Sequence, residues 1–128
     1  MYDLILKNNI SLDLIIQIIN KVFKTSDIVD LYVAIMSETG KDIKNDIIYT
    51  LHQTQSVFPL FLSLYMKDSV SNLPESSVAI LFAEMLNTTV VFSDNSINPY
   101  SWNMVKNDGR VIKCYENIDL DYDFSPAV

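Results

Sequence analysis

Glycine, proline and cysteine are scarce in this 128-residue chain, which contains two, four and one of them respectively. With two isolated glycines, Gly40 and Gly109, neither a phosphate-binding P-loop nor a dinucleotide-binding fingerprint can form. The shortage of glycine and proline also argues against long flexible linkers, and the length fits one domain. The single cysteine, Cys114, excludes an internal disulfide and fits a reducing compartment.

Histidine is almost absent as well, since His52 is the only one. One histidine and one cysteine are too few for a zinc site, and nothing local marks Cys114 as an activated nucleophile. The run Asp94–Asn98 spaces oxygen ligands as a calcium loop does, but Pro99 and Val105 stand where such a loop needs glycine and glutamate. The sequence therefore predicts no catalytic, metal-binding or cofactor-binding residues and a protein that is not an enzyme.

Basic residues are the minority charge: nine Lys and Arg face sixteen Asp and Glu, for a net charge of -7. Nucleic acid and anionic membranes would repel such a chain, so we expect neither as a partner. A cationic protein partner fits better, although many acidic proteins are merely soluble. The longest apolar run, Val57–Met66, is broken by Pro59 and Ser63, and no signal-peptide pattern is present at Met1. We expect a cytoplasmic protein that is monomeric when free.

The first half of the chain alternates between strand and helix patterns. Tyr2–Lys7 is a short β-like run, and Leu12–Lys24 has apolar residues at helical spacing. Ile28–Met36 is rich in β-branched and aromatic residues, which predicts a buried strand. Asp46–Thr54 alternates in part, and the near-continuous apolar run Val57–Met66 is typical of a central strand covered on both faces.

The second half begins with a helix and ends in a hairpin. The helix is predicted from Pro74 to about Asn87, and because it is apolar almost all round we expect it to be deeply buried. Thr89–Phe92 follows as a strand. Trp102–Lys106 and Arg110–Tyr115 flank an Asp-Gly turn, the strongest hairpin signal in the chain.

These elements predict an α+β fold in which a mixed β-sheet packs with two main helices. We expect a single compact domain over residues 1–128, with residues 116–128 forming a loosely ordered acidic tail.

Two features suggest a binding surface. The segment Asp94–Trp102 sets aromatic rings beside polar turn residues, as binding anchors are, but large rings also cap cores, and both interpretations stay open. The tail interleaves acids with aromatic residues, which suits a cationic protein partner and equally an ordinary solvated terminus. The candidate partner-binding residues are Asp94, Tyr100, Trp102, Asp108, Glu116, Asp119, Asp121 and Asp123.

A family resemblance rests on the overall pattern and on one motif. The chain starts strand-helix-strand, has an apolar helix in its second half, and carries Asn98-Pro99-Tyr100-Ser101-Trp102 ahead of Asp108-Gly109. In this it resembles small bacterial immunity proteins of polymorphic-toxin and contact-dependent growth inhibition systems. The resemblance implies tight one-to-one binding of a cognate toxin inside the cell. Many such toxins cleave nucleic acid and have basic active sites, so we expect the acidic loops and the tail, with Tyr100 or Trp102 as anchors, to occlude a basic toxin surface.

Three other functions fit the same sequence. A secretion or assembly chaperone is also small, acidic and cytoplasmic, but is expected to dimerise and to bind an extended segment. A small enzyme could use scattered carboxylates in a cleft that the sequence does not show. A subunit of a larger complex would expose an apolar patch of more than a few hundred Å².

Overall fold

The computed structural model describes residues 1–37, 44–117 and 122–126, and its strands form one eight-stranded sheet in the order β2-β3-β4-β1-β5-β6-β7-β8. The β2–β3 pair is parallel and the other neighbours are antiparallel, so the sheet is mixed and the predicted α+β class is confirmed. The strands are β1 (Tyr2–Leu6), β2 (Ile28–Asp30), β3 (Ile47–Gln53), β4 (Leu60–Met66), β5 (Val90–Ser93), β6 (Ser101–Val105), β7 (Val111–Glu116) and β8 (Phe124–Pro126). The helices are α1 (Leu12–Phe23), α2 (Leu31–Ser37) and α3 (Glu75–Leu86).

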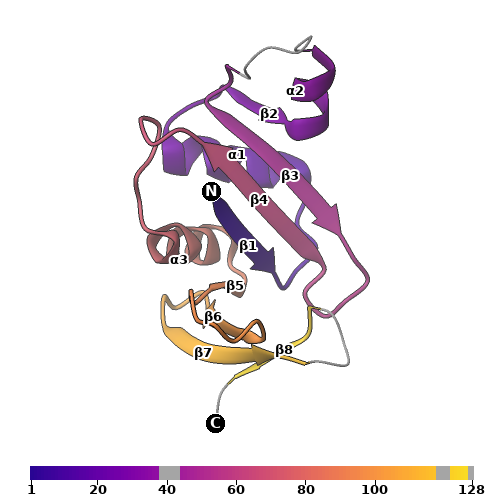
Figure 1. Ribbon diagram of the computed structural model, residues 1–128, viewed down its shortest axis with the longest axis vertical. Helices are drawn as coiled ribbons and strands as arrows, with labels where there is room; N and C mark the ends of the chain where they lie inside the picture. The colour runs from indigo at the N-terminus through magenta and orange to yellow at the C-terminus, as the bar shows by residue number, and fades with distance from the viewer. Residues whose placement is uncertain (38–43, 118–121, 127–128) are drawn as a thin grey trace.

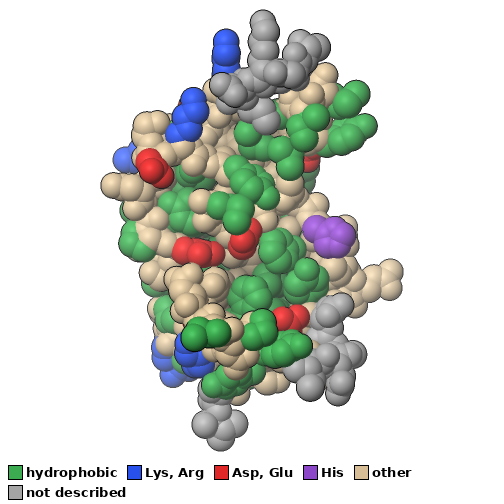
Figure 2. Space-filling view, in the orientation of Figure 1, with side chains coloured by type: hydrophobic (Ala, Val, Ile, Leu, Met, Phe, Trp, Pro, Cys, Tyr) green, Lys and Arg blue, Asp and Glu red, His purple; other side chains and the backbone are tan. Residues whose placement is uncertain are grey.

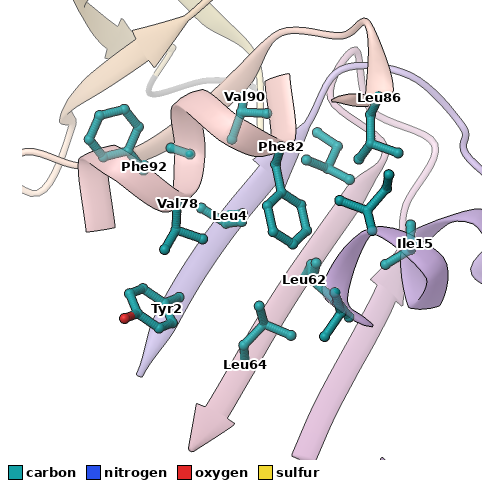
Figure 3. Close-up of a cluster of buried hydrophobic side chains, with 14 of the residues drawn as sticks. Tyr2, Leu4, Ile15, Leu62, Leu64, Val78, Phe82, Leu86, Val90 and Phe92 are labelled. Atoms are coloured by element: carbon teal, nitrogen blue, oxygen red, sulfur yellow. The ribbon is translucent and has the colours of Figure 1, made fainter. Parts of the chain in front are cut away.

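The main core lies between one face of the sheet and the two longer helices. In Figure 1, α1 lies behind β3 and β4, and α3 lies beside β1 and β5. Alternate strand residues such as Leu4 and Leu62 point to this side, because successive side chains of a strand face opposite ways. Figure 3 shows Phe82 directed from α3 toward these strand residues, with Ile15 of α1 nearby. Phe82 is fully buried, so the helices are fixed to the sheet by hydrophobic packing.

The α1 helix and the β6–β7 hairpin form where local signals predict them. The Ser11 hydroxyl caps α1 by accepting a hydrogen bond from the Leu14 amide at 3.3 Å, and Lys24 ends the helix in a left-handed conformation. In the hairpin, Trp102 pairs with Cys114 across the strands. Gly109 closes the turn at a φ of 81°, a conformation that favours glycine. Both predictions are confirmed.

The predicted strand over Ile28–Met36 is wrong after its first three residues. The chain leaves the sheet at Asp30, whose carboxylate accepts hydrogen bonds from the amides of Tyr32 at 2.8 Å and Val33 at 3.3 Å. This is an N-cap, and the following residues form α2. The apolar residues of the segment fit a short helix and a strand equally, so the local signal for the helix was Asp30, a typical N-cap residue.

The predicted loose tail is wrong for the part that the structure describes. Residues 124–126 form β8, which pairs with β7, and Phe124 is buried. The Phe124 ring packs edge-on against Phe58 at 5.1 Å and against Trp102 at 5.7 Å, measured between ring centres. These rings join a second, smaller core on the sheet face opposite to α1 and α3. The segment is kept on the sheet by aromatic residues that are distant in sequence, Phe58 and Trp102, so its own residues could not predict its order.

Two further boundaries differ from the predictions. The strand predicted over Val57–Met66 begins at Leu60, because Pro59 lacks an amide for the sheet ladder and precedes it. The helix α3 is buried on one side only, with Glu84 and Met85 exposed on the other. In the described part of the chain, every helix is too short or too polar to cross a bilayer.

Candidate interaction surface

Asp94, the first predicted partner-binding residue, is committed to contacts inside the protein. Its side chain is only 3% exposed and pairs with the Lys113 ammonium at 2.7 Å. The Ser101 hydroxyl and the Ser96 amide also donate hydrogen bonds to its carboxylate. Burial opposes ionisation, but the hydrogen bonds from Lys113, Ser101 and Ser96 outweigh it and hold the pKa of Asp94 well below its ordinary value. Asp94 therefore braces β5, β6 and β7.

The two aromatic candidates, Tyr100 and Trp102, differ in how accessible their rings are to a partner. Tyr100 is 45% exposed and directly precedes β6, where its carbonyl accepts a hydrogen bond from the Glu116 amide at 2.7 Å. Trp102 instead packs on Phe124 in the smaller core, and its indole nitrogen has no hydrogen-bond partner among the described residues. Tyr100 is accessible to a partner, whereas Trp102 acts mainly as a core cap.

The acidic candidates do not form one cluster. Asp108 is exposed at the turn, where its carboxylate accepts from the Arg110 amide at 2.9 Å. It lies beyond the Val105–Val111 pair, which is five residues from Tyr100 along the strand, so the two are separated by more than about 16 Å. Glu116 accepts from the Tyr122 amide at 3.0 Å, and Asp123 lies close by, since its carbonyl accepts from the Asn117 amide. Asp119 and Asp121 lie outside the described residues.

The residues that sequence reasoning missed belong to α2. Tyr32, Val33, Ile35 and Met36 are 71%, 54%, 57% and 67% exposed, and we call these residues the α2 patch. They lie within a helix of seven residues, in which Ala34 is fully buried. Figure 2 shows hydrophobic side chains gathered over α2 at the upper right. A concentration of large apolar side chains in solvent is a typical sign of an interaction site.

A second group of apolar side chains lies on the sheet face turned away from α1 and α3. Ile48 and Tyr65 pair across β3 and β4, and Phe61 follows on the same face of β4. The Phe61 ring contacts Tyr122 at 5.8 Å, so the smaller core bounds this strip at one end. α2 packs against β2 and β3 at its other end. We call Ile48, Phe61 and Tyr65 the open sheet face.

Acidic groups accompany these apolar residues. Asp3 lies on the same face, where its carboxylate accepts from the Ser63 hydroxyl at 2.7 Å, and its amide donates to Glu75 at 3.2 Å. Burial raises the pKa of Glu75 and the Asp3 carboxylate raises it further, although the Asp3 amide and the Met1 amino group oppose both. In Figure 2, red side chains lie among the green ones in the middle of the view, while blue ones lie near its top and left margins. The surface is therefore apolar and acidic.

The two groups with catalytic potential, His52 and Cys114, lie on strands with four others between them in the sheet. Burial raises the pKa of the Cys114 thiol to about 12, and the Asp94 carboxylate contributes to this shift despite Lys113. His52 is exposed on β3. Within residues 1–37, 44–117 and 122–126, no three His, Cys, Asp or Glu side chains converge as metal ligands.

Two open grooves lie elsewhere on the protein. One, of about 620 Å³, runs along α1 and includes Leu14, Lys21 and Met85 in its lining, and the other, of about 520 Å³, lies beside Tyr2 and Asp68. Neither lining contains His52, Cys114, the α2 patch or a predicted partner-binding residue.

Comparison with known proteins adds no relative. No family model, curated protein or solved structure matches this chain.

Proposed function

We propose that this chain is a non-enzymatic binding protein of the cytoplasm, an immunity protein that neutralises a cognate, basic, nuclease-type toxin by occluding its active site. The observation that carries the binding role is the α2 patch, in which four large apolar side chains are more than half exposed, and the net charge of -7 is what favours a basic toxin as the partner. Burial of these side chains against a partner removes apolar surface from water, which contributes favourably to the free energy of binding.

The charge of the chain supports a basic partner. A nuclease active site must hold phosphate and is therefore lined with positive charge, so an acidic inhibitor is steered toward it. Steering raises the association rate, and buried aromatic or apolar anchors such as Tyr32 then slow dissociation. The two effects together suit a protein that must capture a toxin quickly and keep it bound.

The chemistry of Cys114 also favours binding over thiol catalysis. A nucleophilic cysteine works as the thiolate and normally has a pKa lowered toward neutrality. Here burial raises the pKa of the Cys114 thiol to about 12, so the thiol stays protonated at neutral pH. Its side chain contributes to the smaller core with Phe58 and Met104.

The test is affinity capture from the native host lysate at low and at high salt, followed by mass spectrometry. We expect one basic protein to be retained, with less captured at high salt because screening weakens the steering. The captured protein should inhibit growth of the host when it is expressed alone. Co-expression of this chain should then restore growth. Recovery of several secreted proteins by a dimeric bait would indicate a chaperone instead. Failure to retain any partner from a lysate that contains the products of the neighbouring genes would refute the proposal.

A further inference from the structure

The α2 helix packs against β2 and β3 although most of its large side chains face solvent. A helix of seven residues is unstable alone, because nucleation costs more than so few hydrogen bonds return. Asp30 caps its first turn, and Ala34 is fully buried. The Asp30 cap and the buried Ala34 both contribute to fixing the helix, while Tyr32, Ile35 and Met36 are exposed to solvent.

The C-terminal hairpin offers less to a partner. Its exposed apolar residues Tyr100, Val111 and Tyr115 are each between 42% and 46% exposed, and all three are less accessible than Tyr32 or Met36. Trp102 is turned into the smaller core. Since a short exposed helix can enter a groove with several side chains at once, α2 is the better anchor.

The charges beside the open sheet face select among possible occupants. Asp3 and Glu75 lie on or next to the open sheet face, and in Figure 2 the blue side chains keep to the margins of this view. Two copies of the chain, each of net charge -7, would bring like charges together. A partner with Lys or Arg around an apolar groove would pair with these acids.

We infer that α2 and the adjoining open sheet face form the contact surface for the partner, with Tyr32, Ile35 and Met36 entering an apolar groove that is rimmed by Lys or Arg. This inference rests on the proposed function for the identity of the partner. It places the hairpin residues, Tyr100 and Asp108 among them, outside the central contact.

Charge substitutions at Met36 test both parts of the inference. Met36→Glu and Met36→Lys each remove the apolar contact from a site that is 67% exposed, so both variants should fold. Against a cationic rim, Met36→Lys should bind the captured partner at least about tenfold more weakly than Met36→Glu, since like charges across an interface repel. A matched pair at Tyr115, which is 46% exposed, should change affinity less than about threefold.

The outcomes separate the surface from the function. Equal binding by both Met36 variants and the wild type, or larger losses from the Tyr115 pair, would overturn the inference while leaving the inhibitor role intact. A wild-type dimer at micromolar concentration that Met36→Glu dissociates would assign the patch to a second copy and overturn it as well.

A second measurement decides the case in which no partner is captured. Amide chemical shifts are followed by NMR while a designed 20-residue Leu/Lys amphipathic peptide is added, with a Leu/Glu peptide of the same pattern as control. Shifts confined to α2, β3 and β4 with the Leu/Lys peptide alone would support the surface even though the immunity role had failed. Shifts elsewhere, shifts with both peptides, or none would overturn it.

Discussion

Phe124→Ala tests whether the C-terminal segment is part of the core. Complete burial of a phenylalanine makes its replacement by alanine cost about 3–5 kcal/mol. Phe124 is 6% exposed, and the substitution removes its two edge-on ring contacts, to Phe58 and Trp102. Because β8 is a three-residue edge strand that can relax into the gap, we expect the lower end of that range, about 3 kcal/mol.

Urea denaturation with two probes measures this cost. Far-ultraviolet circular dichroism follows the whole fold, and with a slope of about 1.5 kcal/mol per M the midpoint should fall by about 2 M. Trp102 is the only tryptophan and packs on Phe124 with ring centres 5.7 Å apart, so its fluorescence reports the docking of β8 directly. We expect a red-shifted emission in the native variant.

Ser125→Ala is the matched control, because Ser125 is exposed on the same strand. Its effect should stay within about 0.5 kcal/mol, as for most surface substitutions. If Phe124→Ala costs no more than Ser125→Ala and leaves the tryptophan emission unchanged, the segment is a loose tail and the second core is wrongly assigned.

Two further predictions concern titratable groups. Burial raises the pKa of the Cys114 thiol to about 12, so at pH 8 this thiol should react with a thiol reagent at least about a hundredfold more slowly in the folded protein than in urea. Equal rates in the two conditions would contradict the place of Cys114 in the core. Glu75→Gln should stabilise the protein at neutral pH. Burial raises the pKa of Glu75 in the fold, so wild-type stability falls as pH rises from the ordinary glutamate range, near 4.3, through that raised pKa. Thermal melts between pH 4 and 8 should show that the variant melts higher than the wild type at neutral pH and that this difference disappears at the acid end. A difference in melting temperature that does not depend on pH would show that the charge of Glu75 is not its cause.

Elements with complete local signals could be predicted from the sequence. The helix α1 has a capping serine, Ser11, and apolar residues at helical spacing, and the Asp108-Gly109 turn specifies a hairpin. These signals act between residues a few positions apart, so the surrounding fold does not have to be known to interpret them. The same holds for the acidity of the chain, which excludes classes of partner whatever the fold.

The candidate surface shows the opposite case. From the sequence, Asp94 and Trp102 are expected to contact a partner. In the structure, Lys113, nineteen residues from Asp94, forms an ion pair with it, and the Trp102 ring packs on Phe124. The sequence pattern also placed the residues of α2 inside a strand, where they would have been buried. An apolar side chain carries the same transfer free energy in a core and in an interface, so its residue type does not reveal which of the two buries it.

The sequence by itself determined an acidic α+β chain with a capped helix, an Asp-Gly hairpin, and neither disulfide nor phosphate loop. Only the tertiary structure decided that residues 124–126 join the sheet, that Asp94 is an internal brace, and that α2 turns its large side chains outward. The physical reason is the range of the interactions. Caps and turns are closed within a few residues, whereas burial and ion pairing depend on partners that only folding brings together.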